Sequence, residues 1–227
     1  MKMKRARKNT IIQIRNNSEL KYISTKDLDQ PTIIEISISE ISVNLNLIPA
    51  TVHTLKFNYN FVNLPCEIPS NIKKVYFYEY CDLLEELPDT IEDIEIHKGF
   101  NHQIDKLHCG IKSISTGWNF NQPIDNLPSS LEKIVLGINF NHQINNLPSN
   151  VKFIYISNPD YDYETIKKLP KSLVFLQLGV NEDIDIEFSF IKSNNINCIS
   201  QFEENYGMNS FTYSNNQYFK NYYFYKI

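Results

Sequence analysis

The stretch LPSSLEKIVLGINFNHQINN, from Leu127 to Asn146, is the clearest copy of a unit that recurs along most of the chain. Each copy opens with an apolar residue, which proline follows in six of seven copies, and the copies begin at Ile48, Ile68, Leu87, Leu107, Leu127, Leu147 and Leu169. The steps between these positions are 20, 19, 20, 20, 20 and 22 residues. A nearly fixed period of this size indicates a repeat architecture.

Three further positions of the unit are apolar in every copy except at Thr116, and the last two of them lie two residues apart, as on one face of a strand. They hold Val52, Ile72, Ile91, Ile111, Leu131, Val151 and Leu173; Leu55, Val75, Ile94, Ile114, Ile134, Ile154 and Leu176; and Phe57, Phe77, Ile96, Thr116, Leu136, Ile156 and Leu178. Because one unit alone can bury little, we expect the copies to stack in register, with strands about 4.8 Å apart around one continuous core.

The composition also favours strands, since isoleucine occurs 31 times, alanine only twice, and phenylalanine and tyrosine 14 times each. Twenty residues with a proline near the start leave little room for a helix, so we expect irregular or 3-10 segments on the convex side. We therefore predict a mainly β solenoid with a parallel sheet on its concave side. The solenoid is predicted at residues 29–190, after a basic N-terminal tail or cap at 1–28 and before an aromatic, asparagine-rich cap at 191–227.

Two smaller features refine this prediction. An asparagine recurs three residues after the last strand position, where its amide can satisfy backbone groups left without partners; these residues are Asn60, Asn119, Asn139 and Asn181. A degenerate earlier unit is predicted with Ile33, Ile36 and Ile38 in the strand positions.

Three central units carry a second motif: FNHQI at Phe100–Ile104, FNQPI at Phe120–Ile124 and FNHQI at Phe140–Ile144. Together with the L-x-x-L-x-L strand pattern, this resembles the FNIP repeat, a leucine-rich-repeat-like family of social amoebae and of giant viruses of amoebae. The resemblance covers residues 48 to about 181. Bacterial effector leucine-rich repeats also open a twenty-residue unit with Leu-Pro, but they favour a small apolar residue where this chain has Phe-Asn. The resemblance implies a non-enzymatic module that binds protein partners, including partners in a host cell.

Two alternative functions stay open. Viral members of the family often carry an F-box before the repeats, which would make them substrate-recognition subunits of ubiquitin ligases, although residues 1–30 are too short and too polar for a three-helix F-box. The basic run Lys2, Lys4, Arg5, Arg7 and Lys8 offers weak nucleic-acid association or nuclear import. A formal net charge of -4 makes nucleic acid an unexpected partner for the whole chain.

Nothing in the sequence predicts an enzyme, a metal, a cofactor or a small-molecule substrate. His102 and His142 share a slot but would lie about 10 Å apart, too far for one metal ion. The pair His108–Cys109 replaces the usual proline and its follower and is the only candidate for a hydrolytic nucleophile. The four cysteines form no C-x-x-C pair, and no long apolar run or secretory signal is evident, so we expect an intracellular protein of the host cytoplasm or nucleus, neither secreted nor in a membrane.

Residues between the apolar strand positions are expected to face outward on the concave sheet surface. Large aromatic and charged side chains among them are candidates for partner binding: Lys56, Tyr76, Tyr78, Glu95, Lys133, Phe153, Tyr155, Phe175 and Gln177. Such side chains can also serve only to pack across strands, and the sequence leaves both roles open.

Overall fold

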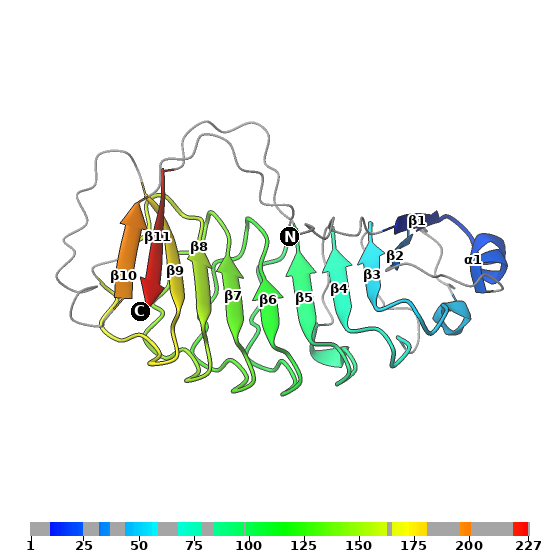
Figure 1. Cartoon of the computed structure of the whole chain (residues 1–227), viewed down its shortest axis with the longest axis horizontal. Helices are drawn as coiled ribbons and strands as arrows, with labels where there is room; N and C mark the ends of the chain where they lie inside the picture. The colour runs from blue at the N-terminus through cyan, green and yellow to red at the C-terminus, as the bar shows by residue number, and fades with distance from the viewer. Residues whose placement is uncertain are drawn as a thin grey trace, which may run out of the picture.

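A computed structural model describes residues 10–24, 32–36, 44–58, 68–78, 84–97, 99–162, 165–180, 196–200 and 220–226. The chain coils into successive turns, called rungs below, and each rung adds one strand to a long sheet (Figure 1). The strands are β1 (Thr10–Ile14), β2 (Thr32–Ile36), β3 (Thr54–Phe57), β4 (Lys74–Phe77), β5 (Asp93–Ile96), β6 (Ser113–Ser115), β7 (Lys133–Leu136), β8 (Phe153–Ile156), β9 (Phe175–Val180), β10 (Ile196–Ser200) and β11 (Lys220–Lys226). The helices are α1 (Asn17–Ser24) and the 3-10 turns η1 (Leu45–Leu47) and η2 (Leu84–Glu86).

Strands β1 to β9 pair in chain order, and every one of these pairings is parallel. From β3 to β9 the register matches the period, so that Leu55, Val75 and Ile94 stand side by side. The predicted mainly β, leucine-rich-repeat-like solenoid with about 20 residues per rung is confirmed. Beyond β9 the direction changes, because β11 pairs antiparallel with β9 and β10 pairs antiparallel with β11.

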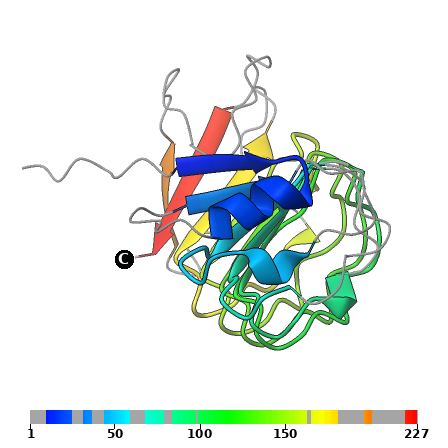
Figure 2. The ribbon, with the colours of Figure 1, turned by 90° about the vertical axis from the view of Figure 1, so that its right-hand side faces the viewer.

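The end view shows the sheet on one side of the coil and the return segments on the other (Figure 2). The inward strand residues and the opening residues of the units form one cluster of buried side chains. The phenylalanines of the FN motif lie in this core and stack rung upon rung. Ring centroids are 6.0 Å apart for Phe100–Phe120, 6.2 Å for Phe120–Phe140 and 6.0 Å for Phe140–Tyr161, and the interplanar angles are 5°, 5° and 17°.

The return segments have the predicted irregular and 3-10 character. After each opening residue the chain makes a tight turn in which a backbone N–H donates to the carbonyl three residues earlier, for example Val52 to Pro49 at 2.9 Å. The one polar residue in an inward strand position also has a partner, because the Thr116 hydroxyl donates to the carbonyl of Val135 at 3.2 Å. No helix in the described segments is long and apolar enough to cross a membrane.

The N-terminal region differs from the prediction in two ways. The pairing places Ile34 beside Leu55 and Ile36 beside Phe57, so the assignment of Ile36 and Ile38 to these positions was wrong by two residues. A shift of two keeps the same side chains on the same face, so alternation alone could not distinguish the two registers. In addition, β1 pairs with β2, so the sheet begins inside the segment predicted as a tail or cap. Helix α1 follows directly and buries Leu20 and Ile23.

The role predicted for the recurring asparagines stays a prediction. Asn119 and Asn139 are exposed, whereas Asn60 and Asn181 lie outside the described residues. The buried asparagine is Asn158, whose Nδ2 donates to the carbonyl of Phe140 at 2.9 Å. After β7, the backbone N–H of Asn139 donates to the carbonyl of Trp118 at 3.2 Å.

Candidate functional site

The outward strand residues form one continuous surface, which we call the outer face. Along β3, β4, β5, β7 and β8 the burial alternates, with the outward residues half-buried and the inward ones buried. The register places the predicted residues in two rows. One row runs Lys56, Tyr76, Glu95, Ser115, Val135, Tyr155 and Gln177, and the other runs Thr54, Lys74, Asp93, Ser113, Lys133, Phe153 and Phe175. The side chain of Gln177 lies outside the described part of the structure.

The first group on this face, the Tyr76 cluster, consists of Lys56, Lys74, Tyr76 and Glu95 on strands β3 to β5. The ammonium groups of Lys56 and Lys74 lie 4.7 and 4.6 Å from the centre of the Tyr76 ring. Lys74 Nζ is also 3.5 Å from Glu95 Oε2. Cations over an aromatic ring are attracted by its negative face, so Tyr76 and Glu95 together hold the two lysines.

Burial and charge act in opposite directions within this cluster. Burial alone would lower the pKa of Lys74, but its hydrogen bond to Tyr76 and the charge of Glu95 outweigh burial and raise it. The pKa of Glu95 is raised, mainly because burial disfavours its charged form, although Lys74 opposes this. Burial likewise raises the pKa of the Tyr76 hydroxyl. Within the Tyr76 cluster, Lys74 is therefore paired with a carboxylate, that of Glu95.

The second group, the Lys133 cluster, consists of Lys133, Phe153, Tyr155 and Phe175 on strands β7 to β9. Phe153 stands between Lys133 and Phe175 in the register. Lys133 Nζ lies 5.4 Å from the Tyr155 ring centre, and the Tyr155 and Phe175 rings are 4.9 Å apart at 41°. Phe175 is only 7% exposed, so it contacts the Tyr155 ring and offers little surface itself.

A row of rings that the sequence analysis missed lies where the strands end. Tyr78 stacks on His97 with centroids 5.0 Å apart, and His97 lies 6.4 Å from Trp118. Tyr78, a predicted residue, is 46% exposed and Trp118 is 39% exposed. The signal was present in the sequence, since Tyr78 and His97 occupy the same position of successive units, one residue after the strand.

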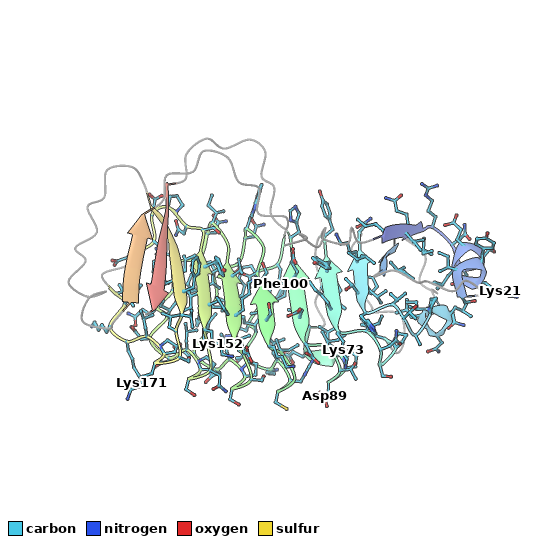
Figure 3. The ribbon with its side chains drawn as sticks, viewed as in Figure 1. Lys21, Lys73, Asp89, Phe100, Lys152 and Lys171 are labelled. Carbon is cyan, nitrogen blue, oxygen red and sulfur yellow. The ribbon has the colours of Figure 1, made fainter. Side chains whose placement is uncertain are left out.

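Charged side chains also alternate in sign at the position just before each strand. This position holds Lys73, Glu92, Lys112, Glu132 and Lys152 in five successive rungs. Lys112 Nζ donates to Glu92 at 2.7 Å and Lys152 Nζ donates to Glu132 at 2.9 Å. Figure 3 shows Lys73 and Lys152 where β4 and β8 begin. The alternation at a step of 19 to 20 residues was visible in the sequence, and it links neighbouring rungs at the surface.

The candidate nucleophile pair does not form a recognisable catalytic arrangement. His108 Nδ1 accepts a hydrogen bond from the backbone N–H of Gly110 at 3.1 Å and lies 3.6 Å from an Asp89 carboxylate oxygen. Burial lowers the pKa of His108 despite Asp89. Cys109 is exposed. The carbonyl of His108 accepts from the N–H of Ile111 at 3.3 Å, so His108 occupies the turn position that proline holds in the other copies.

Among the described residues, no group of three or more His, Cys, Asp or Glu side chains is arranged to hold a metal ion. A shallow depression lies between β1 and α1 at the N-terminal end. It is lined by Ile12, Gln13, Asn16, Ser18, Glu19, Tyr22 and Ile23. Its lining mixes exposed polar side chains with a few apolar ones, and the charged and aromatic groups of the outer face lie elsewhere.

Comparison with models of known families matches residues 100–137 and 120–159 to the FNIP Repeat. The segment 100–159 therefore consists of FNIP repeats, as the FN motifs predicted. Among solved structures, the chain is similar to the crystal structure of CroV588, described as a novel circular LRR protein structure, from a giant virus. The two share 23% identity and align with a TM-score of 0.44 over 65% of this chain. This chain spans about a quarter of that protein's length, the match covering 25% of it. Comparison with curated proteins gives no match.

Proposed function

We propose that this chain is a protein-interaction module and that its outer face binds a protein partner. Leucine-rich-repeat-like solenoids of the FNIP type are typical of interaction modules and are typically non-enzymatic. The observation that carries the proposal is the pair of clusters on the outer face. In each of them a lysine ammonium lies over a tyrosine ring on a regular frame of strands.

The physical argument rests on what such side chains contribute to interfaces. Tyrosine offers a large, rigid contact area with a polar end, and it loses little conformational entropy on binding. Tyr76 and Tyr155 are held in place before any partner arrives, by lysines and by Phe175. Preorganised aromatic groups of this kind are the usual anchors of interaction hot spots.

The proposal is tested by affinity purification from amoebal cells with a tagged full-length chain. The variant Tyr76→Ser with Tyr155→Ser removes both anchors, and Tyr22→Ser, a 64% exposed tyrosine on α1, is the matched control. We expect the double variant to lose partners that the control retains, while circular dichroism shows both to be folded. A folded double variant that keeps every partner would contradict the proposal.

A further inference from the structure

The two clusters on the outer face differ in one respect that bears on the partner. In the Tyr76 cluster the carboxylate of Glu95 lies within 3.5 Å of Lys74. In the Lys133 cluster the ammonium group lies over the Tyr155 ring, and no carboxylate among the described residues forms an ion pair with it. The neighbours of Lys133 across the strands are Ser113 and Phe153, which carry no charge. The second cluster therefore presents a positive charge beside apolar rings.

Resting on the function proposed above, we propose that the Lys133 cluster recognises an acidic, extended segment of the partner. A carboxylate of that segment accepts a hydrogen bond from Lys133 Nζ. An apolar side chain two residues away in the partner lies on Phe153 and Tyr155. A charge-assisted hydrogen bond of this kind is stronger than a neutral one, and the half-buried rings beside it exclude water.

The spacing follows from strand geometry. Neighbouring strands of the sheet lie about 4.8 Å apart. Strand β7, which carries Lys133, is therefore about 4.8 Å from β8, which carries Phe153 and Tyr155, and about 9.6 Å from β9, which carries Phe175. An extended peptide advances about 3.3 Å per residue and points alternate side chains to the same side. Residues i and i+2 of such a peptide are therefore about 6.6 Å apart and face the sheet together. The expected motif is an acidic residue and an apolar residue separated by one position.

A carboxylate fits this site better than a phosphate. Phosphate recognition favours guanidinium groups, which bind two oxygens at once, or several cations together. Lys133 is the single cation of its cluster, and the one arginine among the described residues, Arg15, follows β1 at the other end of the sheet. One lysine offers a point charge, which suits one carboxylate.

The test uses the full chain and three synthetic octapeptides, GTETFTGS, GTQTFTGS and GTTEFTGS, each blocked at both ends. The first has the expected motif, the second lacks the charge and the third has the wrong spacing. Binding is measured by NMR titration with the wild type, with Lys133→Gln and with Lys106→Gln. Lys106 is an exposed lysine paired with Glu85 at 3.3 Å, so its replacement removes the same charge away from the outer face.

We expect the first peptide to bind with a Kd below about 1 mM, and Lys133→Gln to weaken it about tenfold, the loss of one hydrogen bond to a charged group. Lys106→Gln should leave the affinity unchanged. The inference is overturned if none of the peptides binds in this range, if GTQTFTGS or GTTEFTGS binds as tightly as the first, or if Lys133→Gln has no effect. Its failure would be separate from that of the proposed function, because the Tyr76→Ser, Tyr155→Ser purification can still show loss of a partner.

Discussion

The side-chain oxygen of Asn101 accepts a hydrogen bond from the backbone N–H of Asn121, one rung further along, at 2.7 Å. Asn121 repeats the contact with the N–H of Asn141 at 2.9 Å. The phenylalanine before each of these asparagines stacks in the core on the phenylalanine of the next rung. The FN pair therefore joins neighbouring rungs twice, once at the surface through the amide and once inside through the ring.

The first prediction concerns the asparagine contact. Asn121→Ala removes the acceptor for the Asn141 N–H and should lower the free energy of unfolding by about 1 kcal/mol. Asn121→Asp keeps an acceptor oxygen and should cost less. Asn119→Ala, an exposed asparagine two residues earlier, is the control and should change the stability by less than about 0.5 kcal/mol. Urea denaturation measures all three, and equal losses for Asn119→Ala and Asn121→Ala would refute the role of this contact.

The second prediction concerns the ring stack. Phe120 is 0% exposed and has stacked rings on both sides, so Phe120→Ala should cost about 3–5 kcal/mol. Tyr161, at the end of the stack, directs its hydroxyl to the carbonyl of His142 at 3.0 Å, and burial raises the pKa of that hydroxyl to about 12. Tyr161→Phe keeps the ring and should cost only about 1 kcal/mol. Thermal denaturation distinguishes the two, and similar losses would argue against the stack as the main contribution.

The third prediction compares two glycines. A Cβ atom on Gly137 would overlap the carbonyl oxygen of Gly117 on the neighbouring rung, so Gly137→Ala should cost more than about 2 kcal/mol. Gly99 has a φ of 74° but nothing near its Cβ position, so Gly99→Ala should cost about 1 kcal/mol from backbone strain alone. Chemical denaturation of both variants gives the comparison, and the reverse order would show that rung spacing relaxes freely at Gly137.

The fourth prediction concerns acid. The hydrogen bond from Lys152 lowers the pKa of Glu132 below its usual 4.5, and Lys112 does the same for Glu92. These pairs favour the folded state above that pH, and their contribution is lost as the pH falls through the lowered pKa values. The loss should be small, weaker in high salt, and reduced by combining Glu92→Gln with Glu132→Gln.

Glu95 should change the stability in the opposite direction as the pH falls. Its pKa is raised, mainly by burial, so protonation of Glu95 favours the folded state as the pH falls through the raised value. Glu95→Gln should therefore make the acid loss of stability steeper. The measurement is the free energy of unfolding against pH for the wild type and both sets of variants. A shallower acid loss for Glu95→Gln than for the wild type would contradict the raised pKa of Glu95.

The sequence predicted the rungs and the inward residues well. Apolar side chains that recur every 20 residues can all be buried together if the units stack in register. The prediction failed where the sequence pattern was compatible with two strand registers. In β2, Ile34 and Ile36 satisfy the same alternation as Ile36 and Ile38 do, and neither β1 nor β2 follows the apolar residue and proline that open six of the seven units. The cross-rung contact of the Asn121 amide with the N–H of Asn141 was not predicted, because it depends on loop geometry that spacing alone does not specify.

The outward side chains could be named from the sequence, but their contacts could not. Alternation identified Lys56, Tyr76 and Lys133 as outward residues, whereas the register of neighbouring strands decides which ring each ammonium reaches. The row formed by Tyr78, His97 and Trp118 was missed for a related reason, since it lies beyond the strands and its rings meet across rungs.

Each strand pairs only with its two neighbours. The contacts that stabilise one rung therefore do not depend on how many rungs the molecule has. Duplicating or deleting a segment such as Leu107–Asn126 adds or removes one whole step of the sheet and keeps the parallel strand pairing of the other steps. A gene encoding such a chain can grow or shrink by 60 nucleotides at a time, and each copied segment can then acquire new outward side chains without disturbing those already in use.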